Sequence, residues 1–232
     1  MTGPGEPRPL ESGEPGGREP GTARPDGPRG PGTGGAGYLD MRVGEFLDEL
    51  AAARPAPGGG SAAALAVALA AALCAMTAEL SARHLAQAPQ LAEESRGLLR
   101  RAAPLAQADA DAYGGVLAAR RAPGTGPASR QREERVSAAL ARASEVPLEV
   151  AELGDRVAAL AAEITDRGNP AVRGDALAAA QLAAAAAQAA AALVQINLAG
   201  MPDDPVPARA AHAARLAAQA ARQACEAVRA AG

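Results

Sequence analysis

The chain has 232 residues, a formal net charge of −3 and no tryptophan, and arginine supplies all 23 of its lysine-plus-arginine charges. The lack of lysine excludes Schiff-base and lysine general-base chemistry. The lack of excess basic charge argues against a nucleic acid as the main partner. A chain of this length can form one domain with a sizeable core, or one domain and a tail.

Residues 1–37 differ in composition from the rest. They contain eight prolines, twelve glycines and a single leucine, so they cannot bury enough surface to offset the entropy of ordering. We expect a disordered tail here and a helical domain over residues 38–232. The tail resembles neither a secretory signal nor an organelle address, and Cys74 and Cys225 are typical of reduced thiols. Both observations predict a cytoplasmic protein.

From Tyr38 onward the composition is dominated by alanine, leucine, valine, glutamate and arginine, which predicts an all-α protein. Because alanine buries little area, alanine-rich helices must approach closely and often gain burial from a second copy of the chain. We therefore predict an up-and-down bundle of about five to six long helices that forms a homodimer. The expected helices are 41–53, 62–86, 90–121 with a kink or interruption at Pro104, 129–166 with a kink or split at Pro147, 172–198 and 208–230.

The helix 62–86 also raises a membrane-spanning alternative, because residues 58–78 carry no charge. Alanine contributes little to membrane insertion, however, and the uncharged run is barely long enough to span a bilayer. We expect a central helix buried on all sides and no membrane partner.

The stretch Pro55-Ala-Pro-Gly-Gly-Gly-Ser61 leads into this apolar helix. Its prolines hold the approach extended, its glycines allow backbone conformations that a Cβ atom would forbid, and Ser61 can cap the helix. Such a turn presents free N–H groups at the positive end of a helix, where an anion or ligand can bind. The alternative is a tight turn with a cap and no ligand.

The helical period separates two neighbouring carboxylates. Asp109 shares a stripe with Leu105 and Tyr113, whereas Asp111 lies with Gln107 on another side of the helix. A carboxylate in apolar surroundings tends to have a raised pKa, which suits general acid/base chemistry. Asp109 is therefore a catalytic candidate, and the alternative is a buried structural carboxylate.

Other polar residues have both structural and functional interpretations. Asp175 lies at the start of the helix 172–198, where a carboxylate is favoured by the helix dipole, and Asn169 can cap the same helix. Asn197 is in line with apolar residues, so we expect its amide to be buried and hydrogen-bonded. Glu149 lies on a face expected to be solvated, and the isolated His84 and His212 give no reason to expect a metal site.

Four motifs occur in a characteristic order: Val43–Leu50 with Arg54–Leu65, Asp109–Tyr113, Glu145–Ala151, and Gly168–Pro170 with Asp175, running on to Ile196–Leu198. Together they resemble the cyclodeaminase/cyclohydrolase family, which includes the C-terminal half of formiminotransferase-cyclodeaminase and stand-alone bacterial relatives. The resemblance covers about residues 41–203. It also nominates Glu149 as a possible site residue.

The resemblance implies a helical dimer that binds a reduced folate and acts on the one-carbon unit between N5 and N10, without a metal or redox cofactor. It nominates two catalytic residues, Asp109 and Asp175, and the substrate-binding residues Gly58, Gly59, Gly60, Ser61, Tyr113, Asn169 and Asn197. The 232 residues include no formiminotransferase segment, so we expect a methenyltetrahydrofolate cyclohydrolase. A formiminotetrahydrofolate cyclodeaminase is the alternative. Leu193, Gln195 and Ala171 stand where relatives commonly carry polar residues, which favours a further alternative, a non-catalytic folate-binding or helical interaction module.

Overall fold

The computed structural model describes residues 37–122 and 127–231. The predicted tail, apart from Gly37, lies outside these residues, so that prediction is not tested. Residues 123–126, between the expected helices 90–121 and 129–166, lie outside them as well. The described residues belong to one compact unit. Within the described part of this unit all regular structure is helical, which confirms the predicted fold class.

The helices follow the predicted order. A short 3₁₀ helix, η1 (Tyr38–Asp40), precedes the short helix α1 (Val43–Ala51), and a second 3₁₀ helix, η2 (Pro170–Val172), precedes α6. The six long helices are α2 (Gly59–Leu80), α3 (Ala88–Ala102), α4 (Leu105–Arg121), α5 (Pro127–Arg167), α6 (Arg173–Asn197) and α7 (Val206–Ala230).

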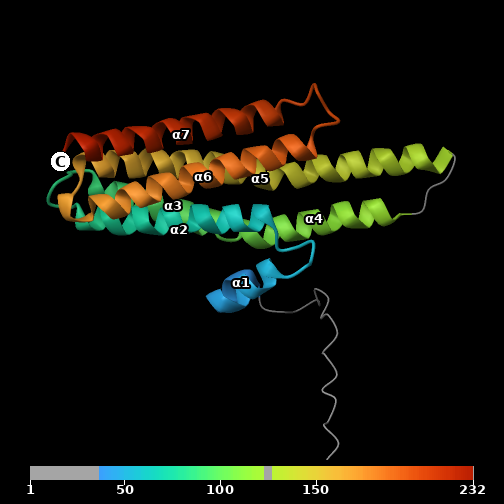
Figure 1. Cartoon of the computed structure of the whole chain (residues 1–232), viewed down its shortest axis with the longest axis horizontal. Coiled ribbons are helices and arrows are strands. Elements are labelled where there is room, and N and C mark those ends of the chain that lie inside the picture. Colours follow the sequence, from blue (N-terminus) through green and yellow to red (C-terminus); the bar gives the residue numbers. More distant parts are fainter. Residues whose placement is uncertain (1–36, 123–126, 232) are drawn as a thin grey trace, which may run out of the picture. The chain divides into compact units, whose positions relative to one another are not determined.

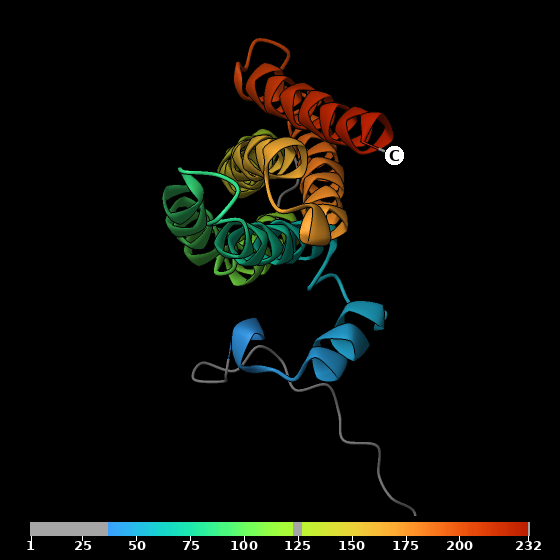
Figure 2. The ribbon, with the colours of Figure 1, turned by 90° about the vertical axis from the view of Figure 1, so that its left-hand side faces the viewer.

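The long helices form an up-and-down bundle (Figure 1). Helices α3 and α4 follow one another along the bundle, and α5 returns beside them over its 41 residues. Helix α5 packs against α6, α7 and α4, and α2 packs against α3, α6 and α4. In the end-on view, α2 and α6 lie next to each other, and α7 is on the far side of the bundle from α2 (Figure 2).

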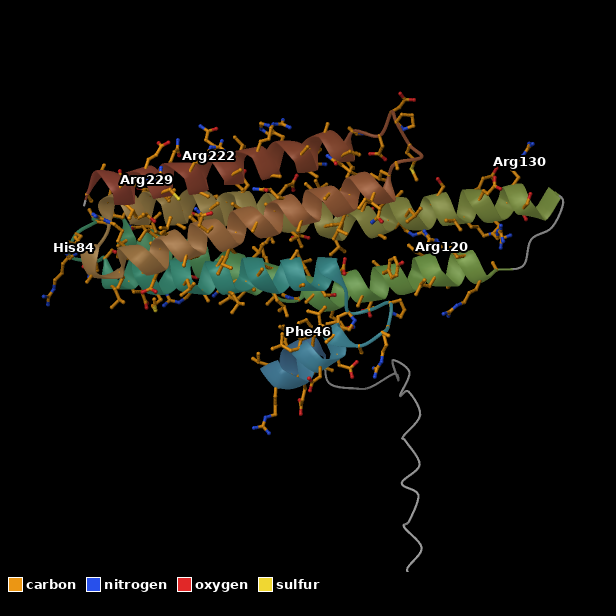
Figure 3. The ribbon with its side chains drawn as sticks, viewed as in Figure 1. Phe46, His84, Arg120, Arg130, Arg222 and Arg229 are labelled. Atoms are coloured by element: carbon orange, nitrogen blue, oxygen red, sulfur yellow. The ribbon has the colours of Figure 1, made fainter. Side chains whose placement is uncertain are left out.

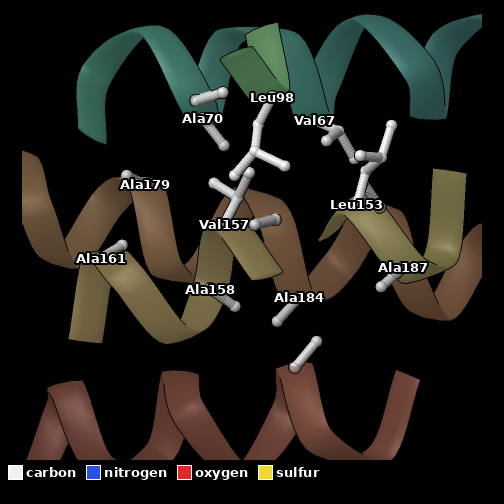
Figure 4. Packing of buried hydrophobic residues seen from close by; sticks show 14 of the residues in the cluster. Val67, Ala70, Leu98, Leu153, Val157, Ala158, Ala161, Ala179, Ala184 and Ala187 are labelled. Carbon is white, nitrogen blue, oxygen red and sulfur yellow. The ribbon is translucent and has the colours of Figure 1, made fainter. Parts of the chain in front are cut away.

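Alanine makes up most of the core. Fully buried alanines of α2, α5 and α6 meet Val67, Leu98, Leu153 and Val157 in the centre of the bundle (Figure 4). Small side chains let the helix backbones approach closely: a Cβ atom added at Gly154 of α5 would lie 3.0 Å from the Ala183 carbonyl oxygen of α6. Close helix packing therefore compensates for the small area that each alanine buries.

Two prolines have different effects on the helices that contain them. Pro104 separates α3 from α4, which confirms the predicted interruption there. Helix α5 continues through Pro147, so of the two predictions for this proline, a kink or a split, the split is wrong. Pro147 is buried, and α5 packs against helices along much of its length, so tertiary contacts hold the backbone helical despite the lost hydrogen bond. Pro104 is exposed and has no such support.

Helices α2 and α6 are long and apolar enough to cross a membrane by length and composition alone. About half or more of the most apolar window in each, 61% for α2 and 50% for α6, is buried inside the bundle. Core helices of soluble proteins pass the same test. The expectation of no membrane partner stays a prediction.

The two cysteines are free. Cys74 of α2 is buried, and burial raises the pKa of its thiol to about 11. Cys225 of α7 is half-buried and accepts a hydrogen bond from Gln181 Nε2 at 2.9 Å. Neither thiol is part of a disulfide, and the expectation that both are reduced stays a prediction.

Candidate active site at the start of helix α2

Helix α4 holds Asp109 against the first turn of α2. The Ser61 hydroxyl donates to the Ala106 carbonyl oxygen at 2.7 Å and lies 3.2 Å from Asp109 Oδ2. Ser61 is fully buried, while Asp109 is only partly buried. The carboxyl group is therefore fixed on one side by α2 and stays accessible from the other.

Gly60 makes this approach possible. A Cβ atom added at Gly60 would overlap the Asp109 carboxyl group, coming within 2.6 Å of Oδ2 and closer still to Oδ1. At Gly59 the nearest atom to an added Cβ would be Leu193 Cδ1, at 3.9 Å, and at Gly58 the Pro55 carbonyl oxygen, at 3.8 Å. Of the three glycines, only Gly60 must lack a Cβ atom for the helices to pack as they do. The group that packs against it is the candidate catalytic carboxylate of Asp109.

The predicted roles of this turn need correction. None of the described glycines has a left-handed φ, and Gly58 is extended, with φ −134° and ψ −158°. Gly58 is the N-cap of α2, so Ser61 lies inside the first helical turn and does not cap it. The Ser61 side chain is directed to α4 instead, because the Ala106 carbonyl oxygen offers it a buried hydrogen-bond partner.

The acidic group at this helix start is the Asp109 side chain itself. Burial raises the pKa of the Asp109 carboxyl group, and hydrogen bonds from the Ser61 side chain and backbone partly oppose that rise. The positive end of α2 adds a further attraction for the ionised form. The net result is a raised pKa, as predicted, in a carboxyl group that is held in place by the chain's own helix terminus.

Asp111 faces elsewhere. It is exposed, and its Oδ1 accepts a hydrogen bond from Gln107 Nε2 at 2.9 Å. The helical period therefore assigned both carboxylates to the correct faces. Glu149, on the neighbouring part of α5, pairs with Arg101 at 3.0 Å, which fits its expected place on a solvated face.

Two further predicted residues lie toward this end of the bundle. Asn197 is the last residue of α6, and Leu193, one turn earlier, comes close to Gly59. Asn197 is half-buried and makes no side-chain hydrogen bond among the described residues, so the expectation that its amide is buried and bonded is only partly met. Tyr113 is half-buried between α4 and α5, packed against Val116 and its neighbours.

Tyr38 belongs to the same region, and the sequence pattern does not predict it. It packs against the edge of the main core and meets Phe46 edge-on, with ring centroids 5.5 Å apart. Burial raises the pKa of its phenol, and the charges of Asp111, Glu49 and Asp109 raise it further. Tyr38 lies between the tail and the first helix, where no periodicity exists, so the sequence pattern carried no signal for it.

Asn169 and Asp175 lie at the other end of α2. The Asn169 backbone N–H donates to Ser81 Oγ at 2.9 Å, its Nδ2 donates to the Leu80 carbonyl oxygen at 3.0 Å, and its Oδ1 caps η2. Asp175 is exposed in the first turn of α6. At about 1.5 Å per residue, Ser81 is roughly 30 Å from Ser61 along α2. His84 marks this end in Figure 3, and Arg120 lies toward the other end.

One chain therefore holds the nominated residues in two groups. Gly58, Gly59, Gly60, Ser61, Asp109, Tyr113 and Asn197 belong to the Asp109 end, and Asn169 and Asp175 belong to the opposite end. Among the described residues no cluster of three or more histidine, cysteine or carboxylate side chains is arranged to hold a metal ion.

The comparisons with known proteins agree with the fold and the motifs. Residues 42–216 match the family model described as formiminotransferase-cyclodeaminase. The chain is 34% identical over 165 residues to a methenyltetrahydrofolate cyclohydrolase from Methylorubrum extorquens, an alignment that covers 68% of this chain and 79% of the relative.

Its fold is similar to the crystal structure of a formiminotetrahydrofolate cyclodeaminase from Thermotoga maritima. The TM-score is 0.71 at 23% identity, covering 82% of this chain and 96% of that one. At this identity the match concerns the fold alone. The family model and the curated relative go further, and they show that the chain belongs to the formiminotransferase-cyclodeaminase family.

Proposed function

We propose that this protein hydrolyses methenyltetrahydrofolate to formyltetrahydrofolate. The observation that carries the proposal is the Asp109 carboxyl group, which has a raised pKa, is fixed against Gly60 and Ser61, and is open on one side. The similarity to a methenyltetrahydrofolate cyclohydrolase over most of that relative's length supports the same reaction.

The chemistry requires one group that moves protons. Water attacks the carbon that bridges N5 and N10, and Asp109 accepts a proton from that water as the new C–O bond forms. The tetrahedral carbon then loses its bond to N5, the proton is delivered to N5, and the formyl group stays on N10. The remaining hydroxyl proton is released to solvent, which balances the loss of positive charge from the methenyl group.

The surroundings of Asp109 suit a cationic substrate. Besides Asp109 itself, Asp111 and Glu49 lie near this site, because their charges act together with that of Asp109 on the phenol of Tyr38. A methenyl group carries a delocalised positive charge, so ionised Asp109 would attract it as well as take the proton. No metal or redox cofactor enters this reaction, and we propose that none is used.

The test is an absorbance assay of methenyltetrahydrofolate with the purified full chain, corrected for spontaneous hydrolysis. We expect an enzyme-dependent loss of absorbance that Asp109→Asn removes. If the chain does not accelerate hydrolysis, the proposal fails. Ammonia release from formiminotetrahydrofolate would then identify a cyclodeaminase, and folate binding without turnover would identify a non-catalytic module.

We also propose that the protein works as a homodimer in the cytoplasm. The composition supports the dimer, because an alanine-rich bundle of this size gains burial from a second copy. Sedimentation analysis of the purified chain tests the dimer, and a stable monomer would contradict it.

A further inference from the structure

We propose that a groove between α4 and α5 binds the carboxylate group of a small ligand through Arg120 of α4 and Arg132 of α5. Neither arginine has a role in the proton transfers of the proposed hydrolysis. Two sources can supply a carboxylate here, the glutamyl end of the folate or a separate small dicarboxylate, and binding measurements distinguish them. In the first case the site rests on the proposed function, because it binds the far end of the same substrate.

The groove lies between the last turn of α4 and the first turns of α5, and its volume is about 400 Å³. A cavity of this size accommodates a small organic molecule. Val136 and Leu140 give it two half-buried apolar side chains, and Ser137 adds a hydroxyl group that can donate a hydrogen bond. Such a lining suits a ligand that has both an apolar part and an anionic group.

Positive charge is concentrated around this groove. Residues 116–142 contain six arginines and two glutamates, a formal charge of +4 in a chain whose net charge is −3. Figure 3 shows Arg120 and Arg130 at this end of the bundle. In the part of the chain that the structure describes, seven arginines form ion pairs with glutamates, and neither Arg120 nor Arg132 is among them. Glu133 also lines the groove, so the lining keeps a net charge of +1 for a ligand.

The helix dipoles account for only part of this arrangement. Arg120 lies in the last turn of α4, where a cation is favoured. Arg130 lies in the first turn of α5 and Arg132 soon after it, near the positive end of the helix, where a cation is disfavoured. No acidic residue in that first turn offsets the repulsion. A carboxylate bound between the two helices would offset it, because guanidinium groups bind carboxylates with two parallel hydrogen bonds.

The groove is aligned with the candidate active site along α4. Asp109 and Arg120 are eleven residues apart, about three helical turns, so they lie on the same side of the helix, about 17 Å from each other along its axis. Tyr113 lies between them and packs against the same small cluster as Leu140, which also lines the groove. By ordinary bond lengths, an extended folate spans roughly 15 Å from its one-carbon unit to its glutamyl carboxylates. A folate that reacts at Asp109 would therefore place those carboxylates within reach of Arg120.

Equilibrium dialysis of the full chain tests the site without measuring turnover. Three probes are compared: tetrahydrofolate, tetrahydropteroate, which lacks the glutamyl group, and glutarate, a small dicarboxylate. If the groove holds the glutamyl end, tetrahydrofolate should bind at least about tenfold more tightly than tetrahydropteroate, because hydrogen bonds between two charged groups are strong. If the groove serves a separate ligand, the two pterins should bind alike and glutarate should bind by itself.

Arginine variants show whether the groove is responsible. Arg120→Gln and Arg132→Gln should each remove whichever of these effects the wild type shows, while helical circular dichroism stays unchanged. Arg121→Gln is the matched control, because it removes the same charge one residue away, is exposed and does not line the groove. It should change each Kd by less than about twofold. Equal losses in all three variants, or no dependence on Arg120 and Arg132 with any probe, would overturn the site.

Turnover separates this site from the proposed function. If the glutamyl end is the source, Arg120→Gln should raise KM for methenyltetrahydrofolate about tenfold and leave kcat within about twofold of wild type. A chain that binds carboxylates through both arginines but hydrolyses no methenyltetrahydrofolate would refute the proposed function and leave the site standing. A chain that hydrolyses methenyltetrahydrofolate and shows no dependence on either arginine would refute the site and leave the function standing.

Discussion

At the scale of single residues, the Asp109 carboxyl group is subject to two opposing effects. Burial against α2 disfavours its charge, whereas Ser61 and the helix terminus favour it. Burial is the larger effect, so the group ionises less readily than a free aspartate. A carboxyl group with a raised pKa accepts a proton more readily than a free aspartate, which suits the proton transfer of the proposed hydrolysis.

Replacement of Asp109 by asparagine tests this role. Asp109→Asn keeps the size of the side chain but removes the titratable proton, so kcat should fall by roughly 10²-fold or more while folate affinity changes little. Asp111→Asn is the control and should change kcat by less than about twofold, because Asp111 is exposed and bonded to Gln107. Steady-state kinetics of both variants decide the matter, and equal losses would refute the assignment to Asp109.

The pH dependence of stability gives an independent test. Because the pKa of Asp109 in the folded state lies above its ordinary value of 3.8, folding takes up a proton between these two values. Stability from this group is present below pH 3.8 and is lost as the pH rises through the folded-state pKa. Denaturant unfolding should therefore show Asp109→Asn at least as stable as wild type at pH 7, with the two curves converging in acid. A less stable variant at pH 7 would indicate a structural carboxylate whose charge is needed.

Gly60 and Gly59 form a matched pair for mutation. Gly60→Ala must displace the Asp109 carboxyl group, so we expect activity to fall at least about tenfold and stability to fall by about 1–3 kcal/mol. Gly59→Ala makes only an ordinary van der Waals contact with Leu193 Cδ1, at 3.9 Å, and should be neutral or stabilising by up to about 1 kcal/mol. Kinetics and denaturant unfolding of both variants test the pair, and full activity in Gly60→Ala would separate Asp109 from catalysis.

The sequence could place Asp109 but could not explain Gly60. Helical spacing depends only on neighbouring residues, and it assigned Asp109 and Asp111 to different faces of α4. The contact between Gly60 and Asp109 joins residues that are far apart in the chain, so no local pattern contains it. For the same reason the sequence predicts Ser61 as a cap, whereas its hydroxyl group donates to the Ala106 carbonyl oxygen of α4.

At the scale of elements, the turn between α5 and α6 is locked onto the end of α2. Ser81 Oγ donates to the Thr77 carbonyl oxygen and accepts from the Asn169 backbone N–H. Gly168 fits beside it, since an added Cβ atom would lie 2.5 Å from the Ile164 carbonyl oxygen and 2.7 Å from Ser81 Oγ. The resemblance nominated Asn169 for substrate binding, and the structure gives it a complete structural role as well.

This junction should be sensitive to one methyl group. Gly168→Ala should lower the free energy of unfolding by about 1–3 kcal/mol, and the melting temperature by about 2–4 °C for each kcal/mol. Gly174→Ala, a few residues later in α6, has open space around its Cα and should not destabilise the protein. Thermal melts of both variants give the comparison, and equal melting temperatures would contradict the tight junction.

At the scale of the whole molecule, composition was enough to predict the bundle but not the separation of its site residues. Alanine-rich segments divided by prolines predict the helix order, and the short connections other than the one at Pro104 make successive long helices antiparallel (Figure 1). Whether two motifs meet depends on which end of a helix each one contacts. The distance between the two groups of site residues follows only from the structure, in which Ser61 and Ser81 lie at opposite ends of α2.

A core built of alanine also limits which substitutions the protein can accept. A core of large side chains loses stability when those side chains are shortened. An alanine side chain is a single methyl group, so shortening it removes very little. At fully buried positions such as Ala71 and Ala180, exchange for glycine should cost about 1 kcal/mol, whereas leucine should cost about 1–3 kcal/mol or prevent folding. A library that varies these positions and is sorted for soluble protein should return glycine and serine and reject branched residues. Enrichment of valine or leucine would show that the helices can move apart. If neither residue is enriched, these core positions can vary during evolution only among the smallest amino acids.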